Sequence, residues 1–395
     1  MKIKAGYLIV VLIYLLMFVA AFTHMRFTVV EARYWIIAYD LSLLAASGLS
    51  ILYFILVSNR KRINLRLLPM LLLVIVGYEF ITSIFSSMFI IPNIFIHVIP
   101  WPFIFLVFYH YSTDNEIPKC FNFITLFCIS FVFVLALPNI IKARTVGDGD
   151  AIFTTFYSFA FLPMVYLHCN KTVSKIYSFI VLLLMLFTLK RSAFIITTVG
   201  IFFYYLLLTY INESKSKKMR KYYHFFWIMV LFGFILNYLI ENFGLTILER
   251  LLNSINDGGS GRMAIWEQVF WYYNSSSIAE KMFGHGFHAV YYNIQPLGMA
   301  RFAHNSFLET LYDYGVIGLL LVLSVFVIVL FKTYKMVIEK YKLAPVMVFA
   351  SVAAMILASI SYFFEVSGMI VPLSAVWGMC IGGFARDKKV IDNES

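Results

Sequence analysis

Uninterrupted apolar runs of about 20 residues recur along this sequence, and they limit what the chain can fold into. The runs at 5–22 and 344–364 contain no charged residue. A helix of this length crosses the hydrocarbon core of a bilayer, which admits only structures that satisfy their backbone hydrogen bonds internally. The runs are continuous rather than alternating, which disfavours a β-barrel, and 13% of the residues are charged, against about 25% in soluble proteins. The sequence therefore predicts an all-α, polytopic integral membrane protein.

About twelve segments qualify as transmembrane helices, and they predict a single transmembrane domain over residues 1–395. No internal repeat is visible, which disfavours transporter folds built from inverted halves. The predicted spans are 5–22, 34–57, 67–91, 94–111, 120–141, 151–168, 176–189, 192–211, 222–241, 309–330, 344–364 and 368–384.

The net charge of +11 lies mainly in short loops between these spans. The strongest basic clusters, 60–66 and 215–221, both fall on one side, as do about two thirds of the Lys and Arg residues. Because cytoplasmic loops carry the excess of positive charge, we expect both termini in the cytoplasm of a multi-pass inner-membrane protein. This distribution argues against nucleic acid as a partner. The first run is interpreted as a retained span, with a cleavable signal peptide as the alternative.

One long polar loop, 242–308, is predicted to lie on the outer face. Its Gly- and Ser-rich stretch 257–261 indicates a hinge. After the hinge, apolar residues at helical spacing predict an amphipathic helix over 262–273 at the membrane interface, inserted between spans nine and ten. The residues that set this spacing are Met263, Trp266, Phe270 and Tyr273. Nearby aromatic residues fit an interfacial belt, namely Trp271, Tyr272, Tyr291 and Tyr292.

Two residues of this loop carry the types of group that chemistry on an anionic, lipid-linked substrate needs. His304 precedes the apolar helix 309–330, where the positive end of the helix dipole disfavours the imidazolium and leaves a ring that accepts protons. Asn305 can cap that helix. Arg262 opens the interfacial helix, where a guanidinium can fork onto phosphate oxygens. The alternatives are an interfacial histidine bonded to backbone and an arginine that holds lipid headgroups.

Further cations stand near the same outer face. Lys190 and Arg191 adjoin each other between two spans, where adjacent charges are costly without an anion, unless they simply end those spans. Arg301 lies three residues before His304 and can assist either group. All three cations are candidates for binding an anionic substrate.

Four carboxylates complete the set of candidate residues. Asp40 and Glu79 lie within predicted spans, where such groups are functional or paired, in this case by bridging to Lys190 or Arg191. Glu309 and Asp313 lie one turn apart at the start of the tenth span, where they can orient His304, bind acceptor hydroxyls or face water.

Several other motifs have simpler interpretations. Gly284-His285-Gly286 with His288 lacks Asp, Glu or Cys at ligand spacing, so a backbone turn is favoured over a metal site. Neither a P-loop, a dinucleotide fingerprint nor an Asp-x-Asp pair is found. The four cysteines fall outside the outer loops, which disfavours a disulfide. We therefore predict chemistry that needs no metal and no cofactor.

Together these segments resemble the O-antigen ligase and O-antigen polymerase superfamily of bacterial envelope enzymes. The resemblance is best over 180–330, while the first half matches only in its number of helices, and Lys190 stands where the family often has Ser or Thr before the arginine. The matching stretches are 188–193, Gly261-Arg262 with Trp266, 283–287, and 303–309 running into Gly315-Val316-Ile317-Gly318.

The resemblance implies a GT-C-like, metal-independent glycosyltransferase at the outer face of the inner membrane. Its donor would be a sugar chain on undecaprenyl diphosphate. His304 would be the general base for the acceptor hydroxyl. Arg262 and Arg191 would bind the diphosphate leaving group, with Lys190 and Arg301 as further candidates for the same role. A single base opposite the leaving group predicts inversion at the anomeric carbon.

Three functions remain open at this point. The first is a polymerase that joins lipid-linked repeat units into O-antigen or capsular polysaccharide, favoured by the Phe-Gly-x-Gly-Phe stretch at 283–287. The second is a ligase that transfers the finished glycan to lipid A-core. The third is a lipid-linked oligosaccharide flippase or other transporter. The expected partners are the lipid-linked oligosaccharide, the bilayer and a chain-length regulator protein.

Overall fold

The computed structural model describes most of the chain, and all secondary structure in the described part is helical, as predicted. The described residues are 2–30, 33–58, 67–85, 96–131, 159–187, 191–212, 223, 262–294, 302–361, 364 and 367–394.

Most of the predicted spans correspond to helices whose ends differ from the predicted ones. The span predicted at 94–111 begins only at Pro100 because two prolines fix its first turn, and the last span continues ten residues beyond 384. The helices are α1 (Lys2–Val30), α2 (Arg33–Ser58), α3 (Leu67–Ile84), α5 (Pro100–Asp114), the helix Cys120–Phe131, α8 (Leu162–His168), α9 (Lys171–Phe187), α10 (Arg191–Asn212), α16 (Ser306–Ile338), α17 (Ala344–Ile360) and α18 (Ser367–Glu394).

Six of the described helices are long and apolar enough to cross a membrane, so the structure supports a polytopic membrane protein. The predicted count of twelve is not confirmed, because nearly all of the span 222–241 and parts of six others fall outside the described residues. The six candidate segments are Ala5–His24, Arg33–Leu56, Leu67–Ile84, Phe194–Asn212, Ser306–Ile338 and Met369–Ile391.

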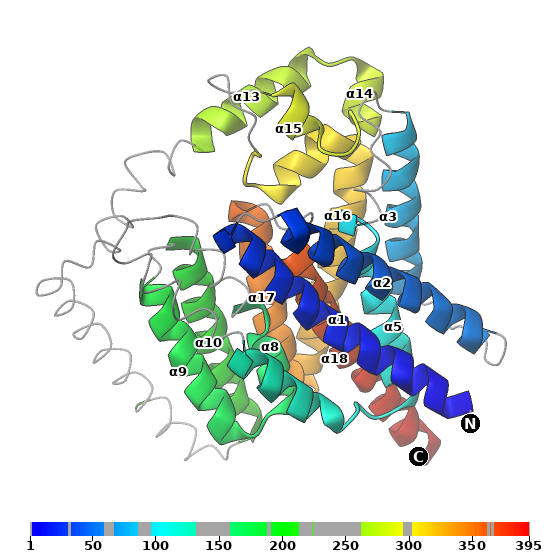
Figure 1. Cartoon of the computed structure of the whole chain (residues 1–395), viewed down its shortest axis with the longest axis vertical. Helices are drawn as coiled ribbons and strands as arrows, with labels where there is room; N and C mark the ends of the chain where they lie inside the picture. Colours follow the sequence, from blue (N-terminus) through cyan, green and yellow to red (C-terminus); the bar gives the residue numbers. More distant parts are fainter. Residues whose placement is uncertain are drawn as a thin grey trace, which may run out of the picture.

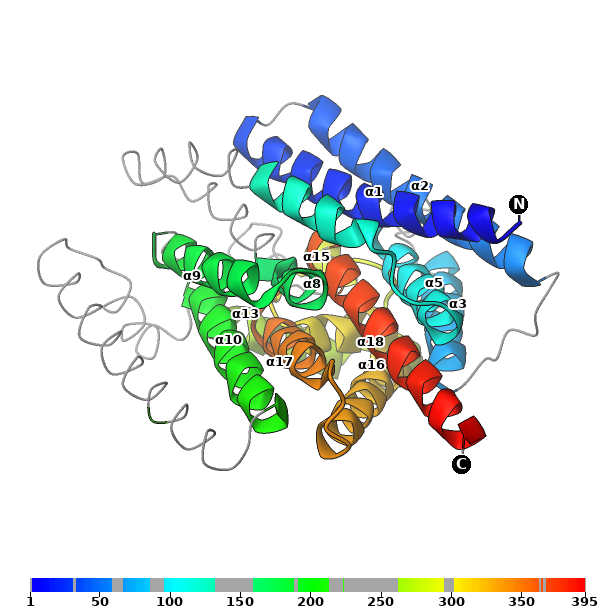
Figure 2. The same cartoon turned by 90° about the horizontal axis from the view of Figure 1, so that it is seen from below.

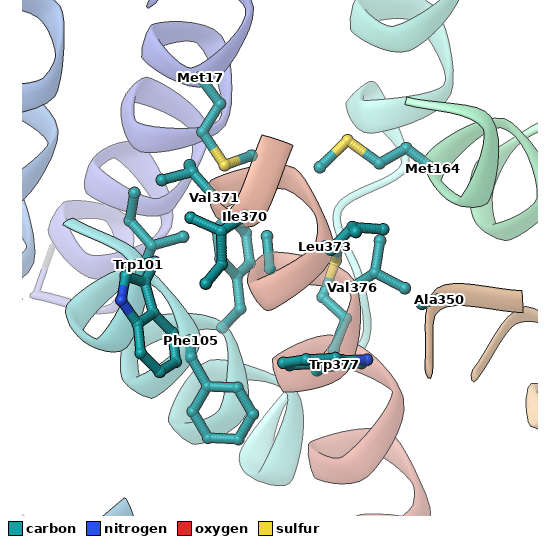
Figure 3. Close-up of a cluster of buried hydrophobic side chains, with 14 of the residues drawn as sticks. Met17, Trp101, Phe105, Met164, Ala350, Ile370, Val371, Leu373, Val376 and Trp377 are labelled. Atoms are coloured by element: carbon teal, nitrogen blue, oxygen red, sulfur yellow. The ribbon is translucent and has the colours of Figure 1, made fainter. Parts of the chain in front are cut away.

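The centre of the helical bundle is the contact between α5 and α18. Gly378 allows this contact to be close, because a Cβ atom there would lie 2.6 Å from the carbonyl oxygen of Phe105. Small residues at helix interfaces favour such approach in membranes. Figure 3 shows the side chains that fill the surrounding core, with Trp101 and Phe105 facing Trp377 and the rest of α18. The last helix is therefore a buried central element.

The helices run so that both ends of the chain lie on one side of the bundle (Figure 1). On that side Arg386 donates through Nη1 to the carbonyl oxygen of Asn115 at 2.7 Å, and Lys388 pairs with Glu339 at 2.7 Å. Helices α9 and α10 flank α17 on one side, and α3 and α5 flank α16 and α18 on the other (Figures 1 and 2).

Three short helices cover the opposite side of the bundle (Figure 1). They are α13 (Arg262–Ser275), α14 (Ile278–Phe283) and α15 (Ala289–Asn293), called the cap below. The helix predicted at 262–273 is confirmed as α13. The residues of α13 that pack on α15 and α16 are Ile265 and Val269, with Trp266 and Tyr273 of the predicted apolar face beside them. The other two residues of the predicted face, Met263 and Phe270, are exposed.

Candidate functional site

The helix α16 begins at the point that the sequence indicated. Asn305 is its N-cap, and its Oδ1 accepts hydrogen bonds of 3.1 Å from the backbone N–H groups of Phe307 and Leu308. A capping side chain of this type satisfies N–H groups that have no partner within the helix. The predicted capping role of Asn305 is therefore confirmed, and it fixes the peptide that follows His304.

His304 lies just outside the helix in the left-handed region, with φ of 53°. This conformation costs a residue with a Cβ atom about 1–2 kcal/mol, so neighbouring contacts must hold it. Its backbone N–H donates to Oε1 of Glu309 at 3.0 Å. On the preceding residue, the carbonyl oxygen of Ala303 accepts a bond of 2.8 Å from Nε1 of Trp266. The backbone at His304 is thus held from both α16 and α13.

Arg262 reaches from the start of α13 to the end of α17. Its Nη1 donates to the carbonyl oxygen of Ile360 at 2.8 Å. The next carbonyl, that of Ser361, accepts a bond of 3.1 Å from Oγ of Ser306, two residues after His304. The Cα atoms of consecutive residues such as Ile360 and Ser361 lie about 3.8 Å apart. Arg262 and Ser306 are therefore bonded to neighbouring peptide groups. The C-terminal end of α17 brings these two predicted site elements together.

The start of α10 lies at the same end of α17. The ring of Phe349 packs against Gly200, and Nζ of Lys340 lies 5.8 Å from the ring centre of Tyr210. These two contacts make α10 antiparallel to α17. At about 1.5 Å per residue, Arg191 lies about 14 Å beyond Gly200 along α10, and Ile360 lies about 17 Å beyond Phe349 along α17. The backbone of Arg191 therefore reaches the level of the Arg262 contact.

Not all of the predicted cations can be placed. Arg191 is the first residue of α10, but its side chain is not among the described ones. Lys190 and Arg301 lie outside the described residues. Their role as diphosphate ligands stays a prediction.

The two carboxylates of α16 are buried, which rules out one of the three predicted alternatives, that they face water. Glu309 is 2% exposed and Asp313 is 1% exposed. Glu309 orients the backbone of His304, which was one of its predicted roles. Asp313 accepts a bond of 2.9 Å at Oδ1 from the backbone N–H of Val290 and so fastens α15 to α16. Each carboxylate therefore accepts a hydrogen bond from a backbone N–H group.

The two carboxylates within earlier spans lie on α3 and α2. Glu79 is buried on α3, which packs against α16 and α5, and Asp40 is half-buried on α2, which packs against α1 and α5. Arg191 begins α10 on the other side of α16–α18 (Figures 1 and 2). The arrangement of the helices therefore does not favour the predicted bridge to Arg191.

The stretch Gly284-His285-Gly286 forms a backbone turn, as the sequence favoured. Gly284 and Gly286 have φ of 84° and 95°, values that residues with a Cβ atom rarely adopt. Within the described part of the chain, no group of three or more His, Cys, Asp or Glu residues is arranged as a metal site. The turn lies against α16, and its role is structural.

Three contacts of this site were missed by the sequence interpretation. Trp266 was assigned to an interfacial face, whereas its indole nitrogen holds the residue before His304. Ser306 ties α16 to α17, and Tyr78 of α3 donates to the carbonyl oxygen of Tyr314 at 2.8 Å. No sequence spacing relates these pairs, since each joins segments distant along the chain.

Comparison with known families adds an independent observation. Residues 176–323 match the family model described as O-antigen ligase. This region belongs to the O-antigen polymerase and ligase superfamily. The matched region includes Arg191, Arg262 and His304, and the superfamily indicates a membrane enzyme of polysaccharide biosynthesis of the polymerase or ligase type. No curated protein matches the chain.

Proposed function

We propose that this chain is a polysaccharide polymerase that transfers a glycan from undecaprenyl diphosphate to a lipid-linked repeat-unit acceptor. One observation carries the proposal: Arg262 and the His304 segment are fastened to consecutive carbonyls at the end of α17. Both lie within the region that matches the superfamily. A base and a cation held together at a membrane surface are what glycosyl transfer from a lipid diphosphate needs.

The proposed reaction has one bond-forming and one bond-breaking event. The acceptor hydroxyl gives its proton to a ring nitrogen of His304, and its oxygen forms a bond to the anomeric carbon of the donor. The bond from that carbon to the phosphate oxygen breaks, and its electron pair stays on the diphosphate. Attack opposite to the leaving group inverts the anomeric carbon.

The cations stabilise the leaving group. Charge develops on the diphosphate as the bond breaks, and donors already fixed in place stabilise that charge at little reorganisation cost. Arg262 is held by α17, and Arg191, Lys190 and Arg301 are the further proposed ligands. The proposed reaction uses no cofactor.

The distribution of charged residues over the described part of the chain supports one orientation of the protein in the membrane. The side of the bundle that holds both termini carries many cations, among them Lys335, Lys340, Lys342, Arg386 and Lys388. The cap side carries Glu267, Glu280, Glu309 and Asp313 as well as cations. By the positive-inside rule we place the termini in the cytoplasm, and the cap and the site in the periplasm, of a cell with an inner membrane.

The depth of the cap supports a position in the outer leaflet. The hydroxyl of Tyr78 lies 3.4 Å from the carbonyl oxygen of Phe283, at the end of α14. Tyr78 is about 9 Å before the end of α3 at 1.5 Å per residue, and α3 is a candidate span. We therefore place α14 within the boundary of the lipid, beside the lipid-linked substrates.

The ligase is the alternative, and the description of the matching family favours it. The two functions differ in the acceptor, which is a lipid-linked repeat unit for the polymerase and lipid A-core for the ligase. The test is deletion of the gene in a smooth strain, with lipopolysaccharide examined on a gel. The polymerase predicts a band with a single repeat unit. Polymer that accumulates on undecaprenyl diphosphate would contradict the polymerase and support the ligase.

A second experiment separates an enzyme from a flippase. The purified chain in detergent is given lipid-linked repeat units, with no vesicle present. We expect longer glycans to form, because bond formation needs no membrane barrier. A protein that moves substrate across vesicles but joins nothing in detergent would be a transporter, and the proposal would be wrong.

A further inference from the structure

The helix α16 is broken at Gly315, which has φ of 67° and ψ of −173°. The break separates Ser306–Tyr314, which follows His304, from the longer part that continues to Ile338. In an unbroken helix the carbonyls of residues 312, 313 and 314 would accept from N–H groups four residues further on. Here each of these three carbonyls accepts a hydrogen bond from outside α16.

The turn at Gly284–Gly286 supplies two of the donors. The carbonyl oxygen of Tyr312 accepts from the backbone N–H of His285 at 3.2 Å, and that of Asp313 accepts from the N–H of Gly286 at 2.7 Å. This contact requires glycine on both sides. A Cβ atom on Gly284 would overlap the carbonyl of Asp313, and one on Gly315 would overlap that of Met282.

The side chain of His285 adds a further bond to the same carbonyl. Its Nδ1 lies 3.1 Å from the carbonyl oxygen of Tyr312, and its Nε2 lies 3.1 Å from Oγ of Ser276. A carbonyl oxygen can only accept, so Nδ1 carries the proton in this contact. The ring also stacks on that of Tyr312, with 4.2 Å between ring centres.

Tyr78 supplies the third donor from a different helix. Its hydroxyl donates to the carbonyl oxygen of Tyr314 at 2.8 Å, and its ring lies against Gly318, where an added Cβ atom would be 3.3 Å from Cε1 of Tyr78. The hydroxyl therefore takes the place of a donor at a carbonyl that would accept from the N–H of Gly318 in an unbroken helix. Insertion of a side chain into the helix ladder is a known cause of sharp kinks.

From these contacts we infer that Tyr78 and His285 are positioning residues, which hold α16 in its broken form and thereby place His304 at the end of α17. The inference rests on the proposed function of His304. A straight α16 would satisfy the same three carbonyls internally, so the donors from outside the helix are what favour the broken form. The segment 306–314 carries Glu309, and with it the orientation of His304.

A matched pair of substitutions at His285 tests this role. His285→Asn keeps a nitrogen donor near the position of Nδ1, whereas His285→Gln places its amide nearer to that of Nε2. The assay uses the purified full chain and lipid-linked repeat units extracted from a strain without the gene. We expect His285→Gln to lower kcat roughly 3- to 10-fold, the effect of about one hydrogen bond, with KM for the donor unchanged. His285→Asn should stay within about twofold of wild type.

Tyr78→Phe tests the second donor, since it removes only the hydroxyl. We expect a similar loss in kcat, and Tyr334→Phe, on the exposed far part of α16, is the matched control with wild-type kinetics. Equal losses for His285→Asn and His285→Gln, or wild-type kcat in both Tyr78→Phe and His285→Gln, would overturn the inference. So would a change confined to KM.

Amide hydrogen exchange of residues 284–287 separates this inference from the proposed function. We expect faster exchange in His285→Gln and Tyr78→Phe, whether or not the protein transfers sugar. Unchanged exchange in both would show that these groups do not hold the break. If exchange responds as expected but His304→Asn transfers glycans at the wild-type rate, the proposed function fails and the contacts at the break remain.

Discussion

His304 has a left-handed backbone, with φ of 53°, and this conformation explains why its neighbours matter. A histidine in an ordinary loop samples many directions, whereas this one is fixed by Glu309 on one side and by the Trp266 contact to Ala303 on the other. The adjacent Asn305 cap removes the remaining freedom of the following peptide. A base held in this way loses little entropy on reaching the acceptor hydroxyl.

Glu309 provides a test of that restraint. Glu309→Gln keeps an oxygen that can accept from the N–H of His304, whereas Glu309→Ala leaves that N–H without it. An unsatisfied buried donor costs about 1–3 kcal/mol, so we expect Glu309→Ala to lower transfer by about 10-fold or more and Glu309→Gln to lower it less. Initial rates with lipid-linked repeats measure both. Equal rates for the two variants would contradict the role of the hydrogen bond.

A substitution at Arg262 tests whether this residue binds the diphosphate or a lipid headgroup. Arg262→Lys keeps the charge but loses the planar fork, so we expect kcat/KM for the lipid-linked donor to fall roughly 10-fold or more. Lys281→Arg is the control, because Lys281 is another cation of the cap and donates to the carbonyl of Asn274. A wild-type kcat/KM in Arg262→Lys would favour a headgroup contact instead.

The buried ring of His288 leads us to expect that the protein becomes less stable at low pH. Burial lowers its pKa to about 3, whereas the unfolded chain binds the proton near pH 6.5. Its ring stacks on Phe287 and lies 6.1 Å from that of His97. The unfolded state therefore takes up more protons as the pH falls below about 6.5, and stability falls with it, by about 2 kcal/mol at pH 5.

The thermal midpoint in detergent at pH 7 and pH 5 measures this effect. His288→Asn removes the titration and tolerates the left-handed φ of 60° at this position. We expect a smaller loss of Tm on acidification in His288→Asn than in wild type. Parallel Tm curves for the two proteins would show that His288 does not contribute.

At the scale of elements, α13 and α14 present an apolar surface away from the bundle. Trp271 is 66% exposed and Ile278 is 82% exposed, with Met263, Phe270 and Phe283 also exposed. The opposite face of α13 packs on α15 and α16. Since α14 also lies beside α3 at the level of Tyr78, this surface is where we expect the cap to meet lipid.

Quenching by brominated lipids tests this contact in reconstituted protein. Trp271 should be reached by bromine near the interface, whereas Trp377 is buried at the centre of the bundle. We expect Trp271→Phe to remove a clear share of the quenchable fluorescence. No change in the quenched fraction would show that α13 stands away from the bilayer.

At the scale of the whole molecule, the sequence predicted well which segments form helices. It did not predict which of these segments contact one another. Apolar length predicts a span such as α16, and cap residues such as Asn305 predict where it begins. The break at Gly315 was not predicted, because its partners are a turn 30 residues away and a tyrosine on α3. Periodicity also did not show that Ile265 and Val269 of α13 would pack against the protein, since lipid and protein both accept apolar side chains.

For the site, too, the sequence predicted single residues but not the contacts between distant segments. His304 and Arg262 were identified from residue type and position, and the capping role of Asn305 from its type alone. That α17 would join them was beyond the sequence, because Ile360 and Ser361 contribute only carbonyl oxygens. Any residue type can supply a carbonyl, so no pattern of side chains marks such a contact.

The central claim is that His304 is the base of a glycosyl transfer carried out at the end of α17. The most direct measurement is the rate of glycan extension by purified His304→Asn, compared with wild type on the same lipid-linked repeats. Asparagine tolerates the left-handed backbone but cannot take the proton. We predict a loss of about 100-fold or more, with donor binding and Tm retained. Extension at the wild-type rate would contradict the account.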